Sequence, residues 1–142
     1  MAKKIAIASG KGGVGKSSLT VGIGKALAAR DKKVLLIDCD CLKSIDLLTG
    51  ITEFLLYNWG DVIKERCESE NALYSAGDVS VITCPDSYED ITAEQMKSLI
   101  KSTKTILITY FLTLRRELIR DLLLPAVWQT EDLLFQLLTL FA

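Results

Sequence analysis

Eight residues near the amino terminus have the types and the spacing of a phosphate-binding loop. Residues 10–17 read Gly-Lys-Gly-Gly-Val-Gly-Lys-Ser and fit the pattern G-x-x-x-x-G-K-[ST]. Glycines allow successive backbone N–H groups to curl around an anion, where side chains would block the approach. Lys16 is predicted to reach the β- and γ-phosphates of a nucleotide, and the Ser17 hydroxyl to hold Mg²⁺. The predicted nucleotide-binding residues are Gly10, Lys11, Gly12, Gly13, Val14, Gly15, Lys16, Ser17 and Ser18.

The segments on either side of this loop are those that a phosphate site requires. Residues 4–8 form a short apolar run typical of a buried strand. After the loop, Leu19, Ile23, Leu27 and Ala28 fall on one face of a helix. A strand, a glycine-rich turn and a helix together favour a phosphate site over a glycine-rich turn without a ligand, and the helix dipole adds to the attraction for an anion.

A second lysine inside the loop indicates a particular family. The run GKGGVGKSS resembles the deviant phosphate loop of the MinD/ParA family of ATPases, which includes the nitrogenase iron protein and the iron–sulfur carrier ATPases. The resemblance implies that Lys11 reaches across an ATP-bridged homodimer to the partner's phosphates, in the manner of an arginine finger. The alternative is a solvated loop lysine.

Two aspartates follow the next predicted strand. Residues 33–38 form a continuous apolar run that ends in Asp38, typical of a parallel strand buried on both faces. This strand completes a βαβ unit and would bring Asp38 and Asp40 toward the phosphates. The stretch from Asp38 to Gly50 resembles the MinD pattern D-x-D…LDLLLG, although it is one residue shorter between Asp40 and Asp46. The resemblance implies that Asp38 helps to hold the Mg²⁺ shell and that Asp40 positions the attacking water. The predicted catalytic residues are therefore Lys11, Lys16 and Asp40, and the predicted metal residues are Ser17 and Asp38.

Composition excludes several other classes of protein. The chain has 142 residues, which fits one domain. Its net charge of −1 argues against a broad basic surface for nucleic acid. It contains no histidine, and therefore no histidine for acid–base chemistry or metal binding. Its four cysteines form no C-x-x-C pair, and a nucleotide-binding domain suggests the reducing cytosol. Cys39 and Cys41 alternate with the aspartates, but two thiolates do not complete a metal site, and we interpret them as small buried residues.

The remaining patterns predict an α/β fold, a P-loop NTPase with a mostly parallel sheet flanked by helices. Further helices are predicted at residues 59–66 and 69–74, and another begins at a Thr92 cap paired with Gln95. Met96, Leu99 and Ile100 would form the buried face of that last helix. Strands are expected near residues 3–8, 33–38, 78–83 and 104–110. This is about half of a MinD-like domain.

The resemblance ends near Ser102. All 9 glycines lie at or before Gly77, and residues 103–142 hold 12 leucines. The family has a D-S-P-A-G second switch after the next strand, and here residues 112–116, directly after the apolar run 105–111, include no acid and no glycine. Codons shifted by one base permit D-S-P-A-G-I from the Leu112/Thr113 junction onward, and the Trp128/Gln129 junction forces alanine. We therefore interpret residues 1–102 as MinD-like and residues 103–142 as an out-of-frame tail of a single nucleotide-binding domain; a genuine leucine-rich tail is the alternative.

The resemblance implies a function in spatial regulation. Family members of the septum-site-determining type are cytoplasmic ATPases that dimerise through ATP, associate peripherally with the membrane and position the cell-division site or a cell-pole structure. Because the second switch is missing here, hydrolysis of ATP by this chain stays open. The alternatives are a nucleotide-binding fragment without catalysis, and an ATPase similar to the iron–sulfur carriers or the nitrogenase iron protein.

Overall fold

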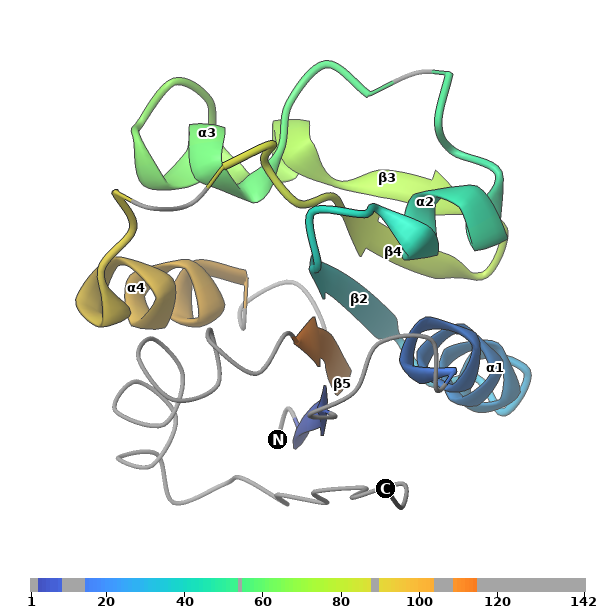
Figure 1. Ribbon diagram of the computed structural model, residues 1–142. Helices are drawn as coiled ribbons and strands as arrows, with labels where there is room; N and C mark the ends of the chain where they lie inside the picture. Colours follow the sequence, from blue (N-terminus) through green and yellow to red (C-terminus); the bar gives the residue numbers. More distant parts are fainter. Residues whose placement is uncertain (1–2, 9–14, 54, 88–89, 104–108, 115–142) are drawn as a thin grey trace.

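The computed structural model describes residues 3–8, 15–53, 55–87, 90–103 and 109–114 (Figure 1). Its strands are β1 (Lys3–Ala8), β2 (Val34–Cys39), β3 (Tyr74–Ala76), β4 (Val79–Ile82) and β5 (Thr109–Leu114). Its helices are α1 (Lys16–Ala28), α2 (Ser44–Thr49), α3 (Trp59–Ile63), the 3₁₀ helix η1 (Ser69–Ala72) and α4 (Ala93–Thr103).

The described strands form one sheet in the order β1-β5-β2-β4-β3. The first four strands of that order are parallel, and β3 pairs with β4 as an antiparallel edge hairpin. The hairpin turns at Gly77, whose φ of 69° suits glycine. The last residues of β1, β5 and β2 lie at one level, because Ala8 pairs with Leu114 and Leu114 pairs with Cys39. The carboxyl ends of β1 and β2 therefore lie level at one edge of the sheet, on either side of β5.

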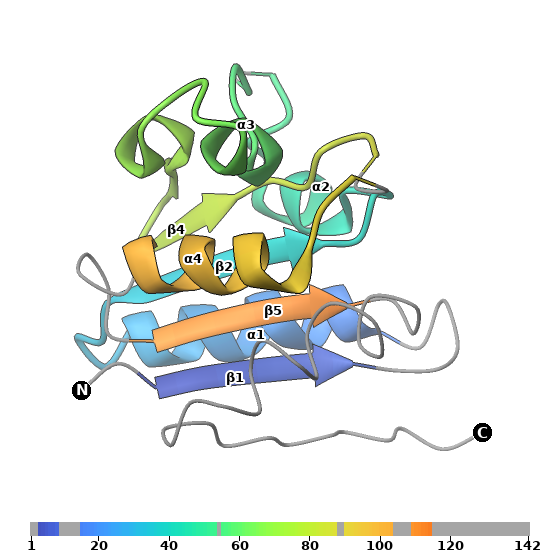
Figure 2. The same cartoon turned by 90° about the vertical axis from the view of Figure 1, so that its left-hand side faces the viewer.

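Helices cover both faces of the sheet (Figures 1 and 2). Helix α1 lies on one face, and α3 and α4 lie on the other. The six residues of β2 are all buried, as the continuous apolar run predicted. Alternate residues of β2 serve different cores, since Leu36 packs with α1 and Leu35 packs with α3 and α4.

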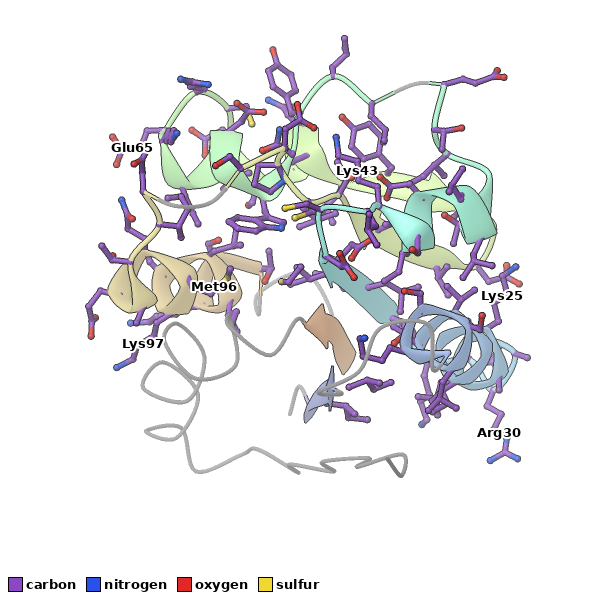
Figure 3. All side chains as sticks on the ribbon, viewed as in Figure 1. Lys25, Arg30, Lys43, Glu65, Met96 and Lys97 are labelled. Atoms are coloured by element: carbon purple, nitrogen blue, oxygen red, sulfur yellow. The ribbon has the colours of Figure 1, made fainter. Side chains whose placement is uncertain are left out.

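Most predicted elements are confirmed, with changes at their ends. Strand β1 matches the prediction, whereas β2 and β4 begin one residue later than predicted. The cap of α4 is confirmed, because Gln95 N donates to Thr92 Oγ1 (3.3 Å) and Thr92 N donates to Gln95 Oε1 (2.9 Å). Met96 lies on the sheet side of α4 and Lys97 points away from it (Figure 3).

Two expectations about secondary structure were wrong, and a third differs in its bounds. The helix predicted at residues 69–74 is the short η1 followed by β3, because Tyr74 pairs with Val81 of β4. Helix α3 ends at Ile63, before the predicted end, and Glu65 takes a left-handed φ of 55°. The strand expected near residues 104–110 is β5, which extends to Leu114; residues 104–108 lie outside the described part.

Candidate functional site

The amino terminus of α1 carries the described end of the predicted phosphate loop. Gly15 has a left-handed φ of 92°, and Lys16 is the first residue of the helix. Lys16 is only 8% exposed, although it is a charged residue. Its backbone carbonyl accepts a hydrogen bond from Thr20 Oγ1 (2.8 Å). Ser17 is half-buried and Ser18 is exposed. The predicted site residues Gly10, Lys11, Gly12, Gly13 and Val14 lie outside the described residues.

The two predicted aspartates lie at the carboxyl end of β2. The carboxylate of Asp38 is buried and accepts backbone hydrogen bonds from Asp40 N (2.9 Å to Oδ1) and Ile45 N (3.2 Å to Oδ2). Asp40 is 7% exposed, and its Oδ1 accepts from Leu42 N (3.1 Å). These bonds hold the turn after β2 against the start of α2.

The side chains of Asp38 and Cys39 lie on opposite faces of the sheet. Leu36 and Ile45 belong to the core under α1 and α2, and Asp38 accepts its bond from Ile45. Cys39 instead belongs to the core under α3 and α4. Since successive side chains in a strand point to opposite faces, the Asp38 carboxylate lies on the α1 side, and the thiols of Cys39 and Cys41 pack on the α3 and α4 side. Helix α1, which begins at Lys16, covers the side of the sheet on which Asp38 lies.

The environment of Asp38 fits a bound cation. The pKa of Asp38 is raised to about 7, mainly by burial and also by the nearby Asp46 and Asp40 carboxylates, against the lowering effect of the two backbone N–H groups. A divalent cation would offset this cost, and Mg²⁺ prefers carboxylate, hydroxyl and water oxygens. The donor set of Asp38 and the Ser17 hydroxyl therefore fits Mg²⁺.

The sheet register brings the two halves of the site to one edge. Ala8 and Cys39 stand level on either side of Leu114. Two strand spacings amount to roughly 10 Å, a distance that a nucleotide phosphate chain and its Mg²⁺ can span. The structure thus places Lys16 at the start of α1 and Asp38 and Asp40 at the carboxyl end of β2, and their roles stay predictions.

A buried contact between Asp46 and Thr83 was not assigned from the sequence. Thr83 Oγ1, just after β4, donates to Asp46 Oδ2 in α2. Among the described residues, Asp46 Oδ1 is a buried oxygen with no hydrogen-bond partner. Burial raises the pKa of Asp46, and the Thr83 bond acts in the opposite direction. The signal available in the sequence was that residues 45–50, which include Asp46, resemble the family pattern LDLLLG. The contact ties α2 to the end of β4.

A tryptophan holds the end of β2 from the other face. Trp59 is fully buried, and its indole N–H donates to the Asp38 backbone carbonyl (2.8 Å). Helix α3 starts at Trp59 because Asn58 and Asp61 form a reciprocal capping box. Sequence reasoning placed this helix but gave its tryptophan no role.

We expect Thr83→Val to lower the free energy of unfolding by about 1–3 kcal/mol, because the Asp46 carboxylate loses its donor. Urea unfolding measures the change. The matched control is Thr49→Val, which removes a hydroxyl bonded to the helix carbonyl of Ile45 and should cost less than about 0.5 kcal/mol. Equal losses in both variants would contradict a special role for the Thr83 contact.

Three thiols gather at the same end of the sheet on the α3 and α4 side. Cys39 and Cys84 are buried and Cys41 is half-buried, and all three are free. The sulfur atoms of Cys41 and Cys84 lie 3.8 Å apart. Burial raises the pKa of Cys39 and of Cys84. The described part of the chain contains no group of three or more His, Cys, Asp or Glu side chains that could hold a metal ion.

A cavity of about 620 Å³ lies elsewhere, between α3, η1 and α4. Its lining includes Val62, Glu65, Cys67 and Leu99. None of the predicted site residues lines it. No helix within the described ranges is long and apolar enough to cross a membrane.

Comparison with known proteins agrees with this geometry. Residues 5–120 match the CobQ/CobB/MinD/ParA nucleotide binding domain. The septum site-determining protein MinD of Synechocystis is 39% identical over 110 residues, which cover 73% of this chain and 41% of that protein.

Two solved structures share the fold. The MinC:MinD cell division complex of Aquifex aeolicus superposes with a TM-score of 0.70 and 34% identity, covering 79% of this chain and 46% of that one. MinD of Pyrococcus horikoshii, solved with Mg-ADP, gives a TM-score of 0.69 and 26% identity, covering 79% and 48%. The chain thus spans less than half the length of these relatives.

Proposed function

The chain belongs to the CobQ/CobB/MinD/ParA nucleotide-binding domain family, and we propose on this basis that it binds ATP with Mg²⁺ at the carboxyl end of β1 and β2. The observation that carries the proposal is the joint placement of a buried lysine at the start of α1 and two buried aspartates at the end of β2. In this proposal the lysine binds phosphate, Asp38 binds the cation that accompanies it, and Asp40 faces the attacking water.

Each residue has a role in this proposal. The backbone of residues 10–15 and the ammonium of Lys16 bind the phosphates, and Ser17 and Asp38 hold Mg²⁺. Bound Mg²⁺ would neutralise charge on the β- and γ-phosphates. Asp40 orients the attacking water and accepts its proton. Lys11 supplies a positive charge to the phosphates of a second copy, so that ATP joins two chains.

The cellular role proposed here is that of the MinD relatives. An ATP-dependent homodimer would act in the cytoplasm, with peripheral membrane association, in placing the division site or another polar structure. The support is the 39% identity to a septum site-determining protein over 73% of the chain. A MinC-like protein is a candidate partner, because the Aquifex MinD structure was solved with MinC.

Removal of the Asp38 carboxylate should uncouple nucleotide binding from Mg²⁺. We expect Asp38→Asn to abolish the stimulation of ATP binding by Mg²⁺ over an EDTA control, because the neutral amide is a poorer cation ligand. Calorimetry with each variant measures the ratio of the two affinities. The matched control is Asp31→Asn, at an exposed left-handed position after α1. An unchanged Mg²⁺ dependence in Asp38→Asn would count against the metal site.

We also propose that residues 103–142 are read out of frame. In addition to the codon pattern, the register of β5 supports this idea. Leu112 pairs with Ile37 and Thr113 pairs with Asp38. An aspartate encoded at the Leu112/Thr113 junction would therefore stand beside Asp38, where a further Mg²⁺-shell carboxylate is useful. Independent sequencing of the gene tests the proposal, and an intact frame through codons 100–142 in every read would overturn it.

A further inference from the structure

The cysteines at the carboxyl edge of the sheet have no part in nucleotide binding as proposed above. Cys41 lies in the turn after β2, and Cys84 follows β4 by two residues. These strands are adjacent and parallel, with Ile37 level with Ile82. The turn after β2 and the segment after β4 therefore leave the sheet side by side.

We propose that Cys41 and Cys84 are a thiol modification site that closes to an intramolecular disulfide when a small-molecule disulfide such as oxidised glutathione is present. Their sulfur atoms lie 3.8 Å apart. The S–S bond of a disulfide is about 2.05 Å long. Rotation of the two side chains, with a small shift of the turn at Cys41, would bring the sulfur atoms from 3.8 Å to this bond length.

Exposure assigns an order to the two steps. Cys41 is half-buried and is the thiol that a dissolved disulfide can reach, whereas Cys84 is buried. The Cys41 thiolate attacks one glutathione sulfur, a mixed disulfide forms, and one glutathione thiol leaves with the proton. Cys84 then attacks the Cys41 sulfur, the protein disulfide forms, and the second glutathione leaves. Two protein thiols are oxidised and one glutathione disulfide is reduced.

The crosslink would fasten the turn that carries Asp40. Asp40 Oδ1 accepts from Leu42 N, so Asp40 and Cys41 belong to one short turn. A bond from Cys41 to Cys84 would fix this turn to the end of β4. Any effect of the crosslink on ATP turnover rests on the proposed function, but the thiol chemistry does not.

Mapping of thiols tests the proposal without any nucleotide. The reduced full chain is incubated with oxidised glutathione, its free thiols are alkylated, and the intact mass and the peptides are measured. We expect loss of two hydrogen atoms and a bond between residues 34–43 and 67–97, the tryptic peptides with these cysteines. Each peptide holds two cysteines, so variants identify the pair.

Single substitutions distinguish the pair from its neighbours. Cys41→Ser and Cys84→Ser should each prevent the crosslink, with Cys84→Ala as a second variant for the buried position. Cys39→Ser and Cys67→Ser should retain it, and a reducing thiol should reverse it. In wild type the crosslink should raise the thermal midpoint by roughly 5–10 °C.

Three results would overturn the proposal. The first is a wild-type chain that remains fully reduced, and the second is a wild-type chain that stops at the glutathione adduct. The third is a crosslink that persists in the Cys41→Ser variant. A crosslink found equally in urea would show that the native fold does not select this pair. A confirmed thiol map with no ATP binding would refute the proposed function alone.

Discussion

Lys16→Ala should reduce the affinity for Mg²⁺-ATP by at least roughly 100-fold, because it removes the cation that faces two phosphate groups. Hydrogen bonds from a charged donor contribute about 1.5–3 kcal/mol each, and about 1.4 kcal/mol corresponds to a tenfold change in affinity. Lys16 is the first residue of α1 and is buried, which fits a lysine that binds a ligand at the start of this helix. Isothermal calorimetry gives the two dissociation constants directly.

The control for this variant is Lys25→Ala, which removes a lysine from the same helix. Lys25 is exposed and points away from the sheet (Figure 3). Its loss should change the affinity by less than about twofold, since charges separated by more than a Debye length are largely screened. Circular dichroism of both variants verifies that α1 is intact. Equal affinity in Lys16→Ala and wild type would refute the loop assignment.

The second large effect concerns catalysis. We expect ATP turnover by the 142 residues as written to lie near background, and restoration of the shifted frame to recover a slow ATPase. The reason is the missing second switch, whose aspartate and glycine act at the γ-phosphate in the family that the chain resembles. Removal of one preorganised group of this kind costs roughly 10²–10³ in rate. Release of phosphate, measured on both chains at one concentration, gives the comparison.

Two variants of the chain with the restored frame test the roles of Asp40 and Lys11 separately. Asp40→Ala should abolish turnover through loss of the water-positioning carboxylate, and Lys11→Ala through loss of the charge supplied to the partner's phosphates. Glu53→Ala, at an exposed position after α2, serves as the control. Robust turnover by the chain as written, lost in Asp40→Ala, would contradict the idea that residues 103–142 are out of frame.

Local sequence patterns were enough to predict those helices and strands that a single strong signal marks. The apolar run before the loop predicted β1, and the Thr92–Gln95 pair predicted the start of α4. The continuous apolar run at residues 33–38 predicted a strand buried on both faces, because only a strand covered twice tolerates apolar residues at every position. The same run predicted that the two aspartates lie at the carboxyl edge of the sheet, and their roles at the site stay predictions.

The sequence could not predict features that depend on tertiary pairing. Residues 74–76 have no strand pattern of their own, and β3 exists because β4 offers an edge beyond the Gly77 turn. The Thr83–Asp46 contact joins residues 37 positions apart, and the Trp59–Asp38 bond joins residues 21 apart. Such partners become visible only when the strand order is known.

Nuclear magnetic resonance tests the central claim, that nucleotide binds between the start of α1 and the end of β2, most directly. The amide signals of the ¹⁵N-labelled chain are followed as Mg²⁺-ATP is added. We expect saturable shifts at Gly15 to Ser18 and at Asp38 to Cys41, with Val62 and Leu99 at the cavity beside α4 unchanged. Shifts confined to that cavity, with none at Gly15 to Ser18, would contradict this claim.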